Sequence, residues 1–213
     1  MGLPQAIVFD LDGTLWDTTE VVAQAWNSAL RLAKVERTLL TATDIASIMG
    51  MTHDQIFSKL FPDLSERQRE VLSQHCYQQE EACIRRSGGR LYAGVSQGLR
   101  EWSSHLPLAI VSNCQSGYIE LFLEWSGLGG CFVDWECHGN TGLNKAENIK
   151  SLLDRQGWTR ALYLGDTRSD QEAANQAGCD FVFASYGFGQ ATPDARSIDS
   201  FAQLDALWVG GRA

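Results

Sequence analysis

The chain has 213 residues and a mass of 23.5 kDa, of which 44% are hydrophobic and 20% charged. This composition excludes a mainly disordered or fibrous protein and predicts a packed core. A formal net charge of −9 argues against nucleic acid or an anionic membrane as partner. Because no apolar run approaches the roughly 20 residues of a membrane span and the six cysteines form no CxxC pair, we expect a cytoplasmic protein. Both a monomer and a homodimer remain open.

The first predicted elements are a strand and a block of helices. The short run at 7–10 is β-branched and aromatic and stops at an Asp-Gly turn signal, which is typical of a buried strand. From 17 to 88 the spacing of apolar residues and the capping pairs, such as Ser65 with Gln68, predict only helices. Residues 17–88 therefore read as one helical unit.

After Gly89, segments with helix spacing alternate with segments with strand spacing. We expect strands at 108–113, 131–135, 161–165 and 180–184, with helices before and between them, and fraying of residues 209–213. Continuous apolar strands that alternate with helices predict a parallel sheet covered on both faces. The fold class is α/β, a three-layer Rossmann-like core with an inserted α-helical cap. The core comprises 1–16 and 89–213, and the cap 17–88.

Polar residues follow several of the predicted strands or open the helices after them. In an open parallel sheet, ligands bind outside the carboxyl ends of the strands, so these residues form the candidate site. They are Asp10, Asp12, Ser112, Asn113, Lys145, Asp166 and Asp170.

The four aspartates indicate a metal. Asp10 and Asp12 are two residues apart at a strand end, where one could attack while the other moves protons. Several carboxylates in one partly desolvated cleft are unfavourable unless a cation compensates them, and oxygen ligands together with phosphate suit Mg²⁺. Lys145 adds a positive charge, and Ser112 supplies a donor for phosphoryl oxygens.

The segments FDLDGT, VSN and GDTRSD, together with Lys145, resemble the haloacid dehalogenase-like hydrolase superfamily. The chain is most similar to its phosphoglycolate phosphatase-like members, in which a helical cap follows the first motif. The motifs run from 7 to 170 in the family's order, so the resemblance covers nearly the whole chain.

The resemblance implies a Mg²⁺-dependent phosphatase acting on a small phosphate ester. Asp10 would be the nucleophile that forms an aspartyl-phosphate, and Asp12 the proton donor and later the base. Asp10, the backbone carbonyl of Asp12, and Asp166 would bind the metal. Asp170 would bind it directly or through water.

The phosphoryl group would be held by Ser112, Asn113 and Lys145, with Lys145 also neutralising Asp10. In the cap, His53 is a candidate substrate contact because it lies where related enzymes place a loop facing the site. One departure concerns Ala146, which follows Lys145 where many phosphoglycolate phosphatase-like sequences have proline; this leaves the substrate open.

Other functions remain. A phosphosugar mutase of the same superfamily would use the same aspartyl-phosphate but return the phosphoryl group to a sugar. A receiver-like signalling domain would have no reason for the helical insertion, and a binding protein without turnover would not need Asp12 as a proton donor.

Overall fold

The computed structural model describes residues 3–208, so the expected fraying of 209–213 lies outside the described range. Its centre is a six-stranded sheet of order β5-β4-β1-β6-β7-β8 in which every pairing is parallel. The strands are β1 (Ala6–Phe9), β4 (Leu108–Ser112), β5 (Asp134–Cys137), β6 (Ala161–Gly165), β7 (Asp180–Ala184) and β8 (Ser197–Ile198).

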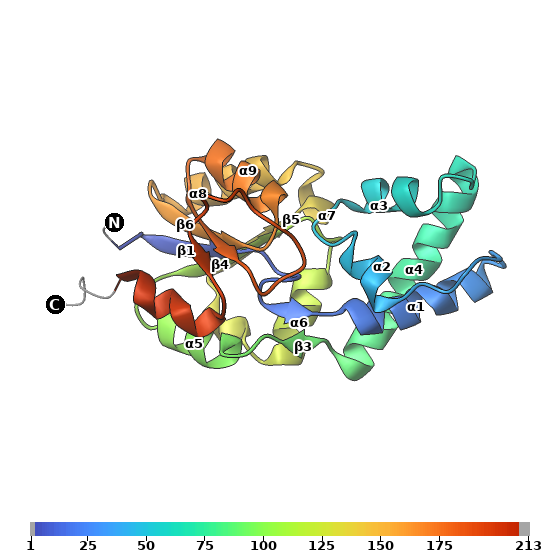
Figure 1. Ribbon diagram of the computed structural model, residues 1–213, viewed down its shortest axis with the longest axis horizontal. Helices are drawn as coiled ribbons and strands as arrows, with labels where there is room; N and C mark the ends of the chain where they lie inside the picture. The colour runs from blue at the N-terminus through green and yellow to red at the C-terminus, as the bar shows by residue number, and fades with distance from the viewer. Residues whose placement is uncertain (1–2, 209–213) are drawn as a thin grey trace.

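Helices cover both faces of this sheet, which gives three layers (Figure 1). One face carries α5 (Val95–Trp102), α6 (Tyr118–Ser126) and the 3₁₀ helices η1 (Gly129–Cys131) and η2 (Phe201–Trp208). The other carries α8 (Lys145–Gln156) and α9 (Arg168–Ala177), while the short α7 (His138–Thr141) follows β5.

Alternation along β1 explains the two covered faces. Ile7 and Phe9 belong to the apolar cluster with α5 and α6, whereas Val8 between them belongs to the cluster with α8 and α9. Successive side chains of a strand point to opposite faces, so β1 is apolar throughout because both of its faces are buried. The predicted α/β class and parallel sheet are confirmed.

A helical unit with its own apolar core lies beside the sheet (Figure 1). It consists of α1 (Thr19–Leu32), α2 (Ala42–Ala46), α3 (His53–Leu60) and α4 (Glu66–Ser87). The capping boxes that begin α3 and α4 are present, with Thr52 and Ser65 as the first residues of each pair. All four helices fall within the predicted cap.

The chain enters and leaves this unit through a two-stranded antiparallel ribbon. β2 (Trp16–Asp17) pairs with β3 (Arg90–Leu91), and Arg90 also forms an ion pair with Asp17 at 2.8 Å. Sequence patterns predicted helix from residue 17, but Asp17 lies in the ribbon, where its carboxylate accepts hydrogen bonds from Thr19.

One strand was predicted three residues too early. The prediction of 131–135 is wrong, because β5 spans Asp134–Cys137 and Cys131 lies in η1. β5 is an edge strand, and three of its four residues are only half-buried. The residues just before it, which include the buried Phe132, are more apolar than the strand, so the apolar pattern placed the strand too early. No helix within residues 3–208 has the length and apolar character needed to cross a membrane.

Candidate active site

Asp10 lies just beyond the carboxyl end of β1, in the middle of the sheet. Its backbone N–H donates to the carbonyl of Leu164 on β6, and its side chain is almost fully buried. Lys145, the first residue of α8, extends Nζ to 2.8 Å from Asp10 Oδ1 and 2.5 Å from Asp170 Oδ1. The structure thus brings together three residues that lie as many as 160 positions apart in the sequence.

Asp166 and Asp170 complete a cluster of buried carboxylates. One oxygen from each of Asp10, Asp166 and Asp170 lies within 4.8 Å of the others. Asp170 is the third residue of α9 and has both oxygens occupied, Oδ1 by Lys145 and Oδ2 by the N–H and hydroxyl of Thr167. Asp166 uses Oδ2 to accept from the N–H of Phe188, while its buried Oδ1 has no partner.

Two glycines allow the backbone to approach Asp166. A Cβ on Gly13 would lie 2.2 Å from Asp166 Oδ2, and one on Gly187 would lie 2.3 Å from Asp166 Cβ. Gly13 also has φ +85°, a region that other residues adopt only with strain. The Asp-Gly pair read in the sequence as a turn signal is therefore also required for close packing around the carboxylate.

The cluster is electrostatically unfavourable on its own. Burial, with the neighbouring Asp170, raises the pKa of Asp10 to about 6 although Lys145 opposes the shift. Burial and the charges of Asp170 and Asp10 raise the pKa of Asp166 well above its ordinary value. Lys145 compensates only part of the negative charge of the three carboxylates, so the cluster favours a further cation.

A hard divalent cation fits these residues. The donor set is entirely oxygen, and the unpartnered Oδ1 of Asp166 is a buried acceptor that lacks a donor. Asp10 and Asp166 are the side chains with which such an ion would make direct contact. Asp170 is already hydrogen-bonded to Lys145 and Thr167, so it would contribute to the metal site indirectly, by holding Lys145 in position.

Asp12 points away from that cluster. Its Oδ1 accepts hydrogen bonds from Tyr118 Oη at 2.9 Å and Thr18 Oγ1 at 3.1 Å. Burial and the charge of Asp10 raise the pKa of Asp12 to about 7, against the lowering effect of these hydrogen bonds. The Asp12 side chain thus faces the helical unit and can hold a proton near neutral pH, and any metal contact by Asp12 would fall to its backbone.

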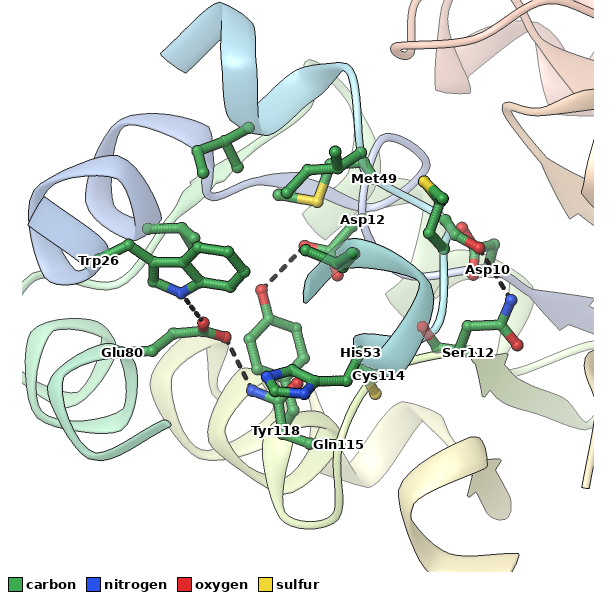
Figure 2. Close-up of a pocket in the computed structure, with 17 residues that line it drawn as sticks. Asp10, Asp12, Trp26, Met49, His53, Glu80, Ser112, Cys114, Gln115 and Tyr118 are labelled. Atoms are coloured by element: carbon green, nitrogen blue, oxygen red, sulfur yellow. Dashed lines mark hydrogen bonds between the residues drawn. The ribbon is translucent and has the colours of Figure 1, made fainter. Parts of the chain in front are cut away.

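Asp10 and Asp12 line a cavity of about 60 Å³ enclosed by the sheet edge and the helical unit. Ser112 and Asn113, which end and follow β4, line the same cavity, as does His53 at the start of α3 (Figure 2). All the predicted site residues therefore meet at this edge of the sheet. Their roles in catalysis and binding stay predictions.

Asn113 and His53 make contacts that the sequence patterns did not predict. Asn113 Nδ2 donates to the carbonyl of Gly50, which joins the β4 loop to the helical unit, and its buried Oδ1 has no partner. The His53 ring stacks on Tyr77 with centroids 4.1 Å apart. Burial lowers the pKa of His53 to about 4, so its imidazole is neutral at pH 7.

A buried carboxylate of the helical unit also lines the cavity and was not predicted. Glu80 of α4 accepts from Trp26 Nε1 at 2.7 Å and from Gln115 Nε2 at 2.8 Å. Tyr118, which donates to Asp12, was not predicted as a site residue either. The sequence does hold a signal for Glu80, because it stands at the four-residue spacing of the buried stripe Leu72, Cys76, Ile84, where an acid is unexpected.

Comparison with known proteins defines the class. The family model for haloacid dehalogenase-like hydrolases matches residues 7–184, which include the helical unit and all the clustered aspartates. The chain belongs to this family, and the resemblance seen in its motifs is confirmed.

More particular relatives share most of its length. A phosphoglycolate phosphatase of Synechococcus elongatus is 31% identical over 187 residues, covering 86% of this chain and 85% of the relative. One of Photobacterium profundum is 29% identical over 215 residues, covering 93% of each.

Solved structures agree on the fold. A predicted phosphoglycolate phosphatase of Haemophilus somnus superposes with a TM-score of 0.83 at 23% identity, over 95% of this chain and 97% of that one.

Proposed function

We propose that the protein is a Mg²⁺-dependent phosphatase that hydrolyses a small phosphomonoester through an aspartyl-phosphate on Asp10. The observation that carries the proposal is the buried Asp10 carboxylate, paired with Lys145 and next to the unpartnered oxygen of Asp166, with a protonatable Asp12 facing the same cavity. Membership of a hydrolase family and relatives named phosphoglycolate phosphatase support it.

Each residue would contribute one function. Asp10 would attack phosphorus, and Lys145 would hold Asp10 in place and offset the charge that builds up as the two anions meet. Asp12 would give its proton to the leaving oxygen and then take one from water. The pKa of about 7 allows Asp12 to do both near neutral pH.

Ser112 would bind the phosphoryl oxygens from the β4 side through its hydroxyl, and Asn113 would do so through its backbone N–H, because Asn113 Nδ2 already donates to Gly50. Bound at Asp10, Asp166 and the Asp12 carbonyl, Mg²⁺ would supply positive charge beside the phosphoryl group. His53 would contact the substrate from the helical unit, which we propose acts as a cap that excludes bulk water.

The names of the relatives make 2-phosphoglycolate one candidate ester. The cavity of about 60 Å³ has room for only a few water-sized groups, which favours a small ester over a large one.

The test is phosphate release from a panel of phosphate esters, with Mg²⁺ and with a chelator. Asp10→Asn should abolish turnover while the circular dichroism spectrum and melting temperature stay close to those of the wild type. Asp154→Asn, an exposed aspartate of α8, is the matched control and should retain full activity. Turnover by Asp10→Asn, or activity unaffected by the chelator, would contradict the proposal. Isomerised sugar phosphate in place of free phosphate would identify a mutase.

Metal binding can be measured separately from activity. Mg²⁺ should raise the melting temperature of the wild type because it binds only the folded state, and Asp166→Asn should remove most of that rise.

A further inference from the structure

We propose that the substrate's leaving alcohol carries no carboxylate: the cavity is built for a small alcohol that is uncharged or cationic, and it discriminates against 2-phosphoglycolate through Glu80. This inference rests on the proposed phosphatase function and specifies its substrate class.

The first step is the direction of the cavity. In Figure 2, Asp10 and Ser112 lie at one side of the cavity and Trp26 and Glu80 at the other, with Asp12 between. Phosphorus must lie at Asp10 and the leaving oxygen at Asp12, which protonates it. The remainder of the alcohol therefore extends towards Trp26 and Glu80.

The second step is the charge at that end. The residues lining the cavity include the carboxyl groups of Asp10, Asp12 and Glu80 and, within the described part of the chain, no lysine or arginine. His53 is the lining residue that could become cationic, but burial lowers its pKa to about 4. The positive charge of Lys145 is used at the other end, where it pairs with Asp10 and Asp170. Burial raises the pKa of Glu80, but the hydrogen bonds that its two oxygens accept from Trp26 and Gln115 oppose this shift. A substrate carboxylate would thus meet the acceptor oxygens of Glu80 without a compensating cation.

The third step is the supply of hydrogen-bond donors. Trp26 Nε1 and Gln115 Nε2 both donate to Glu80, and Tyr118 Oη donates to Asp12. The buried Nε2 of His53 has no partner, so the neutral His53 ring and the second N–H of Gln115 are the remaining polar groups here. Neither group carries a positive charge. A hydroxyl or ammonium group could also donate to Glu80, whereas a carboxylate would find no charged donor.

The rest of the lining on the side of the helical unit is apolar, with Val22, Ile45, Ile48, Met49, Met51 and Ile56. A carboxylate buried among these side chains would lose its hydration without gaining a partner. An alkyl chain would instead be stabilised there. The cavity thus accepts the alcohol by shape and apolar contact and rejects a negative charge.

Three esters with two-carbon alcohols test the inference because they differ mainly in the terminal group: ethyl phosphate, 2-aminoethyl phosphate and 2-phosphoglycolate. For the wild-type protein with Mg²⁺ at pH 7, kcat/KM for ethyl phosphate and for 2-aminoethyl phosphate should each exceed that for 2-phosphoglycolate by about tenfold or more. A value for 2-phosphoglycolate equal to or above the other two would overturn the inference while leaving the phosphatase function standing. No phosphate release from any ester, p-nitrophenyl phosphate included, would overturn both.

Glu80→Gln tests the cause of the discrimination. It keeps the size of the side chain and removes the charge, so the ratio of kcat/KM for 2-aminoethyl phosphate to that for 2-phosphoglycolate should fall by about tenfold. A general loss of packing would lower both values together and leave the ratio unchanged, which would count against the role of Glu80. Glu81→Gln, on the exposed face of the same helix, is the matched control and should keep the wild-type ratio. If Glu80→Gln does not fold, the wild-type comparison still decides the inference.

Discussion

Removal of the buried cation at Lys145 should destabilise the protein strongly, even without substrate or metal. Lys145→Met keeps much of the side-chain volume but takes the positive charge from between Asp10 and Asp170, whose side chains are only 2% and 0% exposed. Removing one partner of a buried ion pair costs about 3–5 kcal/mol, and we expect a loss in this range for the free energy of unfolding at pH 7.

The loss should be smaller when a second charge is removed. Asp170→Asn in the Lys145→Met background removes one of the stranded carboxylates, so the double variant should be more stable than the sum of the single losses predicts, by about 1.5–3 kcal/mol. The destabilisation by Lys145→Met should also shrink as the pH falls from 7 to 5, because buried carboxylates with raised pKa values become protonated and then need no cation.

The assay is urea unfolding followed by circular dichroism in the presence of a chelator, at both pH values, for the wild type, the two single variants and the double variant. A loss below about 1 kcal/mol for Lys145→Met, or losses that simply add, would refute the argument that this lysine compensates the cluster.

Two further predictions concern the glycine turn and an ion pair at the sheet edge. Gly13→Ala should remove activity and lower the melting temperature, because the new Cβ would lie 2.2 Å from Asp166 Oδ2. The control is Gly142→Ala, where φ is +71° and a Cβ would meet no atom within 4 Å; it should lower the free energy of unfolding by only about 1 kcal/mol and keep full activity. Despite burial, hydrogen bonds from Arg155 and its neighbours hold the pKa of Asp134 below its ordinary value of 3.8. The ionised Asp134 therefore stabilises the folded state above pH 3.8, and this stabilisation is lost as the pH falls through the lower pKa of the folded state. Arg155→Met should therefore lower stability by about 0.5–1 kcal/mol at pH 7 and by less below pH 3, as measured by urea unfolding; an equal effect at both pH values would contradict this account.

The elements predicted best from the sequence are those indicated by their own residues, through an apolar run or a capping pair. The strands 161–165 and 180–184 were predicted with the bounds of β6 and β7, because their apolar runs stand between clear helix signals. The capping pairs identified the starts of α3 and α4 because the cap is formed within four residues. The helical insertion followed from the absence of strand spacing over 17–88.

Elements fixed by distant partners were missed. β2 and β3 are two residues long and exist only because Trp16 meets Leu91 across the whole helical insertion. The site shows the same division. Asp10 and Lys145 could be proposed from their motifs. The spacing along α4 indicates that Glu80 is buried, but no local pattern indicates that Trp26 and Gln115, from other parts of the chain, bind it there.

The paired strands β2 and β3 bring the two ends of the helical insertion side by side, and this has a consequence for how the molecule can vary. Because the chain leaves the core at β2 and returns to it at β3, next to the same point, we expect that a helical unit of different size could be exchanged at this ribbon without changing the sheet. The residues that act on the phosphoryl group belong to the core and would be unchanged, whereas Glu80, Trp26 and His53 belong to the helical unit and would be replaced with it. Substrate preference could then diversify as a module, separately from the reaction.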